Sequence, residues 1–361
     1  MKVFFLTSTL DAGTGWGRYA QGFLDQARKR LGPENVIAPE PESLASRNLI
    51  FTQPIACLLD ALRLLKVARN CDVIHASTEL MAPLALVLSG LSRKPYVVSI
   101  CGTYGDIRTY SRSVRWLYRS AFSRADQLAV LSHFTEKILL AGVPEAHTTL
   151  VAGGFDPIAI GAERRAPSQE RRILSVGALK PRKGFHTLIE ALIQLKRSGL
   201  ETRCDIVGPI ESPDYHESLL RQAASGGLTE KELVIHGRVS QEELEDFYRR
   251  ADLFVLASEH SGTAFEGLGL VYLEALACET PVIGCLESGA EDVIQDGVNG
   301  RLVPPGRPEV LAQAIGAILS DADLWVRLSL SARPSIAKFT WDAVGADMER
   351  AYLKALGNVV K

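Results

Sequence analysis

Two carboxylates with a glycine-rich turn between them are the residues best suited to chemistry in this sequence. Glu266 and Glu274 stand eight positions apart, and the run GLGL (267–270) follows the first of them. Glycines before an apolar run indicate a turn that opens a helix, and a helix start offers free N–H groups and a positive dipole end to a phosphate. One carboxylate could then reach a ribose and the other a sugar, with a diphosphate between them. For this spacing alone, two solvated glutamates beside a helix start are the alternative.

A group of cations could neutralise such a diphosphate. The run VGALKPRKGFHTL (176–188) reads as a strand, a turn and a helix, with Lys183 directly before Gly184 and with Lys180 and Arg182 nearby. A fixed cation stabilises the negative charge that develops on a departing phosphate. A solvated basic turn is the alternative interpretation.

Two loops in the first half of the chain also follow apolar runs. DAGTGWGRYA (11–20) carries Gly15 and Gly17, which permit close approach of the backbone to a phosphate. SICGTYGD (99–106) places Cys101 and Gly102 at the end of a strand. We interpret Cys101 as a buried, inert thiol and leave a nucleophilic role open. His75, at the end of another strand, is interpreted as a core histidine.

Short apolar strands alternate with helical patterns along the whole chain, and this rhythm positions the loops. It predicts parallel, doubly wound sheets, in which ligands bind at the carboxyl ends of the strands. The expected strands are residues 3–6, 71–77, 95–100, 126–132, 148–151, 172–177, 204–208, 233–237, 253–257, 281–284 and 301–303. One expected helix ends near Ala27, and another begins near Met81. The other expected helices span 135–140, 187–198, 215–224, 241–250, 270–278, 308–320 and 341–356.

Length and composition indicate an ordinary globular protein of two domains. The chain has 361 residues, of which 47% are hydrophobic and 23% charged, with a net charge of −2 that gives no field to attract nucleic acid. Its six cysteines form no C-x2-C pair, so we expect neither a metal site nor disulfides, and scattered cysteines favour a reducing cytoplasm. We expect an N-terminal domain (1–160), a linker (161–171), a C-terminal domain (172–340) and a final helix (341–361) returning to the first domain.

Several of these runs resemble the retaining glycosyltransferases of family 4. EGLGLVYLEALACETPVIG (266–284) is similar to the E-x7-E signature of that family, with Leu268 where Phe is usual and Glu279 where Gly is usual. VGALKPRKG resembles its VGRLxxxKG run, in which Lys183 matches the lysine and Ala178 replaces the arginine. DAGTGWGRYA resembles its GxGRY loop, and Cys101 stands where a histidine is often found. The likeness covers the chain and is most specific over 172–306.

The resemblance implies a GT-B fold, with two Rossmann-like domains facing a central cleft. The first domain would bind the acceptor, and the second would bind a UDP- or GDP-linked sugar without a metal or cofactor. Cys101 and Gly102 would lie near the reacting sugar. Glu266 and Lys183 would be catalytic, and the donor would be bound by Gly15, Gly17, Arg182, Gly267, Leu268, Gly269, Leu270 and Glu274.

The implied activity is transfer of a hexose-type sugar, with retention, to an acceptor hydroxyl in the synthesis of a cell-surface polysaccharide or glycolipid. Two alternatives stay open. One is a nucleotide-sugar epimerase or phosphorylase on the same scaffold. The other is a donor-binding protein without turnover, which the replacements at Ala178 and Cys101 suggest.

A cluster of arginines indicates a surface that could meet a membrane or a lipid-linked glycan acceptor. In the segment 106–126 their spacing predicts one helical face. Such a face would attract anionic headgroups and hold a cytoplasmic protein peripherally on the inner membrane face, and a solvated face is the alternative. The four residues are Arg108, Arg112, Arg115 and Arg119.

Overall fold

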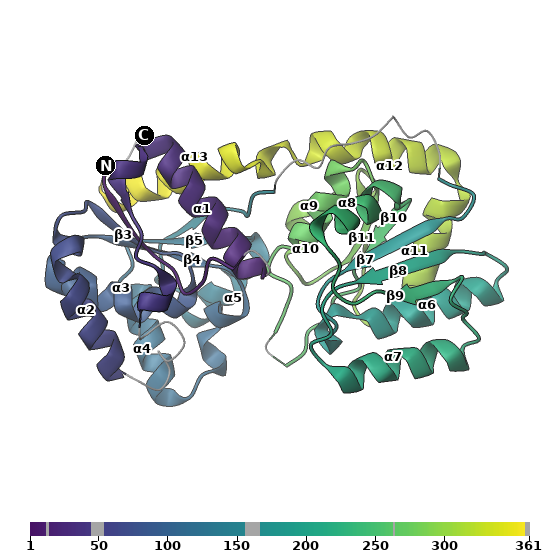
Figure 1. Cartoon of the computed structure of the whole chain (residues 1–361), viewed down its shortest axis with the longest axis horizontal. Coiled ribbons are helices and arrows are strands. Elements are labelled where there is room, and N and C mark those ends of the chain that lie inside the picture. Colours follow the sequence, from purple (N-terminus) through teal and green to yellow (C-terminus); the bar gives the residue numbers. More distant parts are fainter. Residues whose placement is uncertain (12–13, 45–53, 156–166, 263, 358–361) are drawn as a thin grey trace. The chain divides into compact units, whose positions relative to one another are not determined.

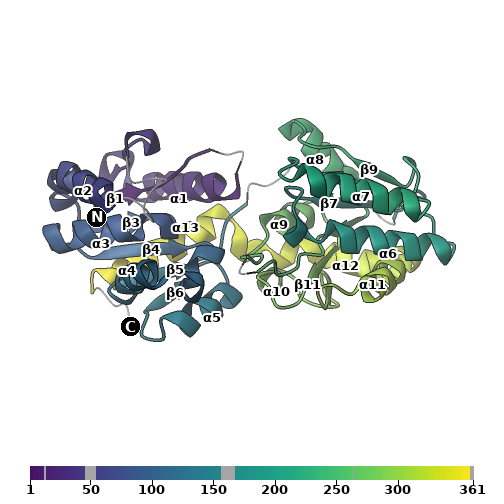
Figure 2. The ribbon, with the colours of Figure 1, turned by 90° about the horizontal axis from the view of Figure 1, so that it is seen from below.

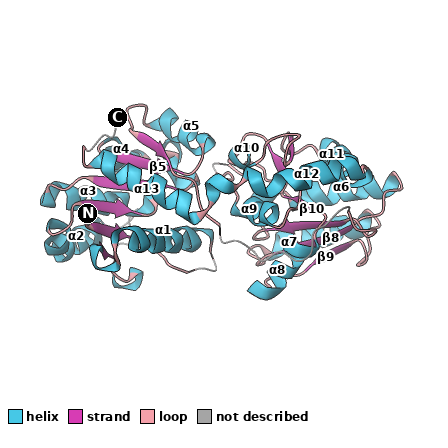
Figure 3. Ribbon diagram, turned by 90° about the horizontal axis from the view of Figure 1, so that it is seen from above, coloured by secondary structure: helices cyan, strands magenta, loops and turns pink. Residues whose placement is uncertain are grey.

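The structure is a computed structural model and describes residues 1–11, 14–44, 54–155, 167–262 and 264–357 (Figure 1). The chain forms two compact units, one made of 1–154 with 339–361 and the other of 155–338. Each unit is built on a six-stranded sheet whose neighbouring strands all run parallel, with helices covering the strands (Figure 3). Of the predicted linker, residues 161–166 lie outside the described residues. No helix in the described ranges is long and apolar enough to span a bilayer.

The first unit has its strands in the order β2-β1-β3-β4-β5-β6, so the chain direction across the sheet reverses between β1 and β3. Its strands are β1 Val3–Leu6, β2 Val36–Ile37, β3 Val73–Ala76, β4 Tyr96–Ile100, β5 Gln127–Val130 and β6 Thr148–Leu150. Its helices are α1 Gly15–Leu31, α2 Pro54–Arg69, α3 Ala82–Ser92, α4 Arg112–Ser123, α5 His133–Gly142 and α13 Trp341–Ala355.

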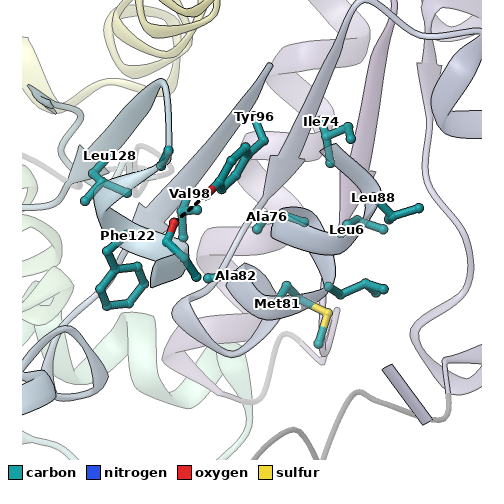
Figure 4. Packing of buried hydrophobic residues seen from close by; sticks show 14 of the residues in the cluster. Leu6, Ile74, Ala76, Met81, Ala82, Leu88, Tyr96, Val98, Phe122 and Leu128 are labelled. Carbon is teal, nitrogen blue, oxygen red and sulfur yellow. Dashed lines mark hydrogen bonds between the residues drawn. The ribbon is translucent and has the colours of Figure 1, made fainter. Parts of the chain in front are cut away.

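Alternate strand residues face opposite sides of this sheet, as the two-residue period of a strand requires. On one side, Leu6, Ile74 and Val98 pack against α2, α3 and α4 in a continuous apolar cluster (Figure 4). The Tyr96 hydroxyl, buried in the same cluster, donates a hydrogen bond of 2.6 Å to the carbonyl of Ala121. These three helices are seen in front of the first sheet from below (Figure 2).

On the other side of the sheet, α13 packs beside α1. The indole of Trp341 lies so close to Gly22 and Gly154 that a Cβ on either glycine would overlap it. His75, fully buried, contacts Ser99 Oγ through Nε2 at 2.9 Å and the Tyr352 hydroxyl through Nδ1 at 2.8 Å. His75 is therefore a core residue, as predicted, and it ties the last helix to the sheet.

The second unit has the strand order β12-β11-β10-β7-β8-β9, which places β7 beside β10 at the point where the order reverses. Its strands are β7 Arg172–Val176, β8 Arg203–Val207, β9 Leu233–Ile235, β10 Leu253–Val255, β11 Val282–Cys285 and β12 Gly300–Val303. Its helices are α6 Phe185–Arg197, α7 Pro213–Ser225, α8 Gln241–Arg250, α9 Leu270–Ala277, α10 Ala290–Val293, α11 Pro308–Ser320 and α12 Ala322–Ser335.

The predicted α/β class with parallel sheets is confirmed, and the expected strands occur within one or two residues of their predicted limits. The sequence patterns missed the two-residue strand β2, the short helix α10, and the helices α2 and α12. They also overextended the arginine helix. Asp106 pairs with the Arg108 guanidinium at 2.7 Å and accepts from its backbone N–H at 3.2 Å, so a separate turn forms before α4 begins at Arg112. The expectation that all four arginines share one helical face is therefore wrong for Arg108.

Candidate active site

The predicted site residues of the second unit lie on the two loops that leave β7 and β10, except for Leu270 and Glu274, which belong to helix α9 after the second loop. These strands are neighbours at the reversal of strand order, which is where parallel α/β sheets bind ligands. The loop after β7 ends in a tight turn, Pro181–Lys183, and α6 starts after Gly184. Gly184 has φ +65°, and a Cβ there would lie 1.7 Å from the carbonyl oxygen of Ala257. Glycine at this position lets the two loops touch.

The touching loops bring two cations to one carboxylate. Lys183 Nζ lies 2.5 Å from Glu266 Oε2, and Arg182 Nη1 lies 3.1 Å from the same oxygen. The exposed fractions of the three side chains are 10% for Lys183, 24% for Arg182 and 11% for Glu266. The Lys183 stem runs past Gly177 on its way to the carboxylate. Three charged groups from two loops thus form one compact, largely buried cluster.

The charges in this cluster shift one another's titration. Burial acts to raise the pKa of Glu266, but the adjacent Lys183 and Arg182 charges and hydrogen bonds outweigh it and hold that pKa below its usual value. Burial lowers the pKa of Lys183, and the Glu266 carboxylate opposes that effect. The carboxylate is therefore ionised at neutral pH, and the cluster carries fixed charge of both signs.

Ala178 stands where the resembling family has an arginine, and Lys180 and Arg182 are the two nearby cations that could supply the missing charge. The structure shows that they have different partners. Lys180 turns away and pairs with Glu211 at 2.8 Å, whereas Arg182 reaches Glu266. Arg182, and not Lys180, is therefore the second cation beside Lys183.

The glycine-rich loop between Glu266 and α9 is buried at Gly267, Leu268 and Gly269, and so is Leu270, the first residue of α9. Gly269 precedes the helix with φ +83°, a conformation that favours glycine, and a Cβ there would strike the Tyr272 ring. The Glu266 carbonyl accepts the Gly289 N–H at 2.8 Å, which fixes the loop against α10. The predicted turn and helix start are thus present, with α9 at Leu270.

Glu274 lies in helix α9 and not on either of the two loops. Its Oε2 atom accepts a hydrogen bond of 2.5 Å from the hydroxyl of Tyr248, a residue of α8 that is 1% exposed. Tyr248 was not among the residues predicted for the site. The clue available was a tyrosine on a short amphipathic helix directly before β10, which carries no specific chemistry by itself.

In the first unit, Gly15 and Gly17 were expected in the loop before the first helix, but they form the first turn of α1. Thr14 caps the helix by accepting the Gly17 N–H at 3.1 Å. Gly17 packs against the backbone of Asp11, where a Cβ would lie 1.9 Å from its carbonyl oxygen, whereas a Cβ on Gly15 would meet nothing within 4 Å. Gly17 is thus required by packing, and Gly15 leaves open space at the helix start.

Cys101 and Gly102 are held by a residue that the sequence analysis did not single out. Glu79, which is fully buried just after β3, accepts the N–H groups of Cys101 and Gly102 through Oε1 at 2.7 and 2.9 Å. Within the described part of the chain, its other oxygen, Oε2, is buried without a hydrogen-bond partner. Burial raises the pKa of Glu79 to about 7, although the N–H groups act in the opposite direction.

Cys101 itself is buried at 6% exposure, and burial, with the nearby Glu79, raises the pKa of its thiol well above the usual value. Its sulfur lies 3.7 Å from the carbonyl oxygen of Ser77. These surroundings favour the inert thiol over the nucleophile. Among the ranges that the structure describes, no three His, Cys, Asp or Glu side chains gather as a metal site.

Two family models match the chain, one on each domain. Residues 23–158 match the model described as Glycosyltransferase Family 4, and residues 159–334 match the model described as Glycosyl transferases group 1.

The curated relatives include transferases that are named for sugar donors and inositol acceptors. The GDP-mannose-dependent alpha-(1-6)-phosphatidylinositol monomannoside mannosyltransferase of Mycolicibacterium smegmatis is 30% identical over 68% of this chain and 61% of its own. A D-inositol 3-phosphate glycosyltransferase of Thermobispora bispora is 32% identical over 65% of this chain and 57% of its own. The matches therefore span less than two thirds of these relatives.

Solved structures share the fold over nearly the whole chain. Anabaena HepE in complex with UDP has a TM-score of 0.79 at 20% identity and covers 97% of this chain and 98% of its own. The sucrose-phosphate synthase of Thermosynechococcus elongatus has a TM-score of 0.80 at 20% identity, with 99% and 100% covered. The first domain thus matches a family 4 glycosyltransferase model and the second a group 1 model, and the chain has the fold of GT-B glycosyltransferase structures.

Proposed function

We propose that this protein is a retaining hexosyltransferase that moves a sugar from a nucleoside diphosphate donor to an acceptor hydroxyl. The observation that carries the proposal is the cluster of Lys183, Arg182 and Glu266 at the reversal of strand order, beside the start of α9. A diphosphate needs cations and free backbone N–H groups, and a sugar needs a carboxylate for its hydroxyls. The cluster supplies the cations and the carboxylate within one loop pair, and the start of α9 follows directly after it.

Each residue then has a separate role. Lys183 and Arg182 would stabilise the departing diphosphate, and the backbone from Gly267 to Gly269 would bind its oxygens. Glu266 would accept hydrogen bonds from the sugar hydroxyls, and these would replace part of its ion pairing with Lys183 and Arg182. Glu274, oriented by the Tyr248 hydroxyl, would bind the ribose.

The chemical step needs no group beyond substrates and these side chains. The acceptor oxygen bonds to the anomeric carbon as the bond from that carbon to the phosphate oxygen breaks. The acceptor proton passes to a phosphate oxygen of the leaving diphosphate on the same face, so configuration is retained. The positive charges at Lys183 and Arg182 favour this step because negative charge grows on the diphosphate.

The names of relatives suggest which substrates to test first. GDP-mannose stands in the name of one curated relative and inositol 3-phosphate in another, and UDP is bound in the HepE structure. We propose a UDP- or GDP-linked sugar as donor and a glycan or lipid-linked molecule as acceptor. A lipid-linked acceptor would place the protein at the inner membrane face, with Arg112 as the arginine most available for contact. Arg108, Arg115 and Arg119 already hydrogen-bond within the unit.

The deciding experiment is incubation with GDP-mannose and UDP-glucose, each with and without inositol phosphate, phosphatidylinositol or oligosaccharide acceptors. Release of nucleoside diphosphate that requires acceptor, with an α-linked product by NMR, is the expected result. An isomerised donor would instead indicate an epimerase. Sugar 1-phosphate formed from a glycan and phosphate would indicate a phosphorylase. A donor-dependent rise in melting temperature without any product would indicate a binding protein.

A further inference from the structure

Helix α2 turns large apolar side chains outward. Its buried side is formed mainly by small residues, among them Ala56, Cys57, Ala61 and Ala68, which pack into the core of the first unit. A surface helix usually shows the opposite arrangement, with its apolar stripe toward the core. The outward residues recur at positions i, i+3, i+4 and i+7 and have high exposed fractions: Ile55 73%, Leu58 49%, Leu59 60% and Leu62 56%.

The same outward side of α2 continues with cations. Lys66 and Arg69 are exposed in the last turns of the helix, one and two turns beyond Leu62. Asp60, the acid within the α2 sequence, is 4% exposed and lies on the buried side. The outward side is therefore apolar at one end and positive at the other. We name Ile55, Leu58, Leu59, Leu62, Lys66 and Arg69 the outer face of α2.

Helix α4 also exposes a large apolar side chain and a cation. Trp116 is 70% exposed, and Arg112 is exposed on the same helix. Helices α2 and α4 both pack on one side of the first sheet, where Cys57 and Tyr118 belong to the same buried cluster (Figures 1 and 2). Exposed tryptophan next to arginine is typical of the boundary between lipid headgroups and acyl chains.

We propose that the outer face of α2 docks on an anionic lipid bilayer, with its apolar residues inserted at the headgroup boundary and its cations among the phosphates. A helix with this composition lies in the interface plane. The outer face of α2 carries no acidic residue, so pairing with the same face of a second copy would leave Lys66 and Arg69 without a counter-charge, whereas an anionic bilayer offers both acyl chains and negative charge. The inference does not depend on sugar transfer, since it concerns a surface and not the site.

The test is flotation of the full chain with vesicles of phosphatidylcholine alone and of phosphatidylcholine mixed with an equal amount of phosphatidylglycerol. We expect the wild type to float with the mixed vesicles. Leu59→Ser with Leu62→Ser is expected to weaken partitioning roughly tenfold or more, since binding scales with the apolar area inserted. Lys66→Gln with Arg69→Gln is expected to weaken it roughly fivefold for each charge at low salt.

The salt dependence separates the two contributions. The charge variant should approach the wild type at high salt, because screening removes the attraction that it lacks. The leucine variant should stay weaker than wild type at every salt concentration.

Matched controls come from α12 in the second unit. Leu330 is 72% exposed and Arg327 is exposed, so Leu330→Ser and Arg327→Gln change similar side chains away from α2. Both controls should float as the wild type does. Because all substituted residues are exposed, circular dichroism and melting temperature should stay unchanged, which excludes misfolding as the cause of lost binding.

Three outcomes would overturn the proposal. One is equal flotation, or none, with both vesicle types. Another is a leucine variant that floats like the wild type. The third is a wild-type dimer in sedimentation without lipid that the leucine variant converts to a monomer, which would assign the outer face of α2 to a second copy of the chain.

Discussion

Lys183 Nζ and Glu266 Oε2 lie 2.5 Å apart although 83 residues separate them in the sequence. The contact exists because β7 and β10 are adjacent and because Gly184 allows the loops that follow them to touch. In the absence of a donor, the cation and the carboxylate neutralise each other. If a donor diphosphate binds Lys183, as we propose, it must share this cation with Glu266, and its binding would then weaken the ion pair of the carboxylate proposed to hold the sugar.

Lys183→Ala should lower kcat/KM by roughly 100-fold or more, since it removes charge stabilisation from the leaving diphosphate. Steady-state kinetics with the donor identified by the incubation test measures the effect. Lys180→Ala is the matched control, because Lys180 belongs to the same turn but pairs with Glu211. Unchanged kinetics in the Lys183 variant, or an equal loss in both variants, would contradict the assigned role.

Glu274→Ala should mainly raise the donor KM. A ribose contact is nearly the same in the ground state and the transition state, so its loss weakens binding without slowing the step. Tyr248→Phe should raise the donor KM in the same direction but less, because it removes only the 2.5 Å hydrogen bond that orients the carboxylate. A fall in kcat at constant donor KM in either variant would place Glu274 at the reacting centre instead.

Cys101→Ser should keep most of the activity, and thiol reagents should inactivate the protein slowly. The thiol is 6% exposed and its pKa lies well above the usual value because of burial and Glu79, so little thiolate forms. Time courses with iodoacetamide, with and without donor, measure the reactivity. Rapid inactivation that donor prevents would place Cys101 in the reacting site. In Cys101→His, which introduces the residue often found in the family, activity should hold or rise if the folded protein accommodates the ring.

Glu79→Gln should change how stability depends on pH. In the folded protein burial raises the pKa of Glu79 to about 7, above its ordinary value of 4.5. The contribution of Glu79 to wild-type stability is therefore fully present below pH 4.5 and is lost as the pH rises toward 7, by at most about 1.4 kcal/mol per pH unit. Glutamine does not titrate and can still accept the N–H groups of Cys101 and Gly102.

The stability of the Glu79→Gln variant relative to wild type should thus rise between pH 4.5 and 7 and then stay level. Denaturant unfolding over a series of pH values, followed by tryptophan fluorescence, gives this difference. Glu40→Gln changes an exposed glutamate of the same unit and serves as the control. A flat difference for both variants would mean that folding does not raise the pKa of Glu79.

Periodicity was a good guide where an element combined one clear apolar pattern with turn residues at its ends. The stretch from β10 through the glycine loop and α9 to β11 is such a case, and so is Lys183 before the Gly184 helix start. In contrast, α2 is apolar on both its buried and its outward sides, so no amphipathic pattern marks it as a helix. Strand β2 has two residues, and α12 contains Pro334, which usually argues against a helix.

Contacts between side chains of elements that are distant in the sequence could not be predicted from local sequence patterns. Tyr248 and Glu274 come from different helices, and Glu79 is a carboxylate that would be expected at the surface but is buried to hold two N–H groups. Arg108 shows the opposite kind of error, in which a local pattern predicted a helix that is not formed at that residue. Its spacing fits a helical face, yet the neighbouring Asp106 captures it and ends the pattern before the helix begins. At this position, an ion pair between residues two positions apart outweighs the helical periodicity of the sequence.

Helix α13 gives the first unit a discontinuous chain, and this has a consequence for synthesis on the ribosome. The second unit is one continuous segment, 155–338, whereas the first requires residues from 339 onward. Until Tyr352 has emerged, His75 lacks the hydroxyl that contacts its Nδ1, and Gly22 and Gly154 lack the Trp341 indole that covers them. The first unit, which starts to emerge before the second, is thus completed after it, and its unfinished sheet face is available to chaperones until α13 has emerged.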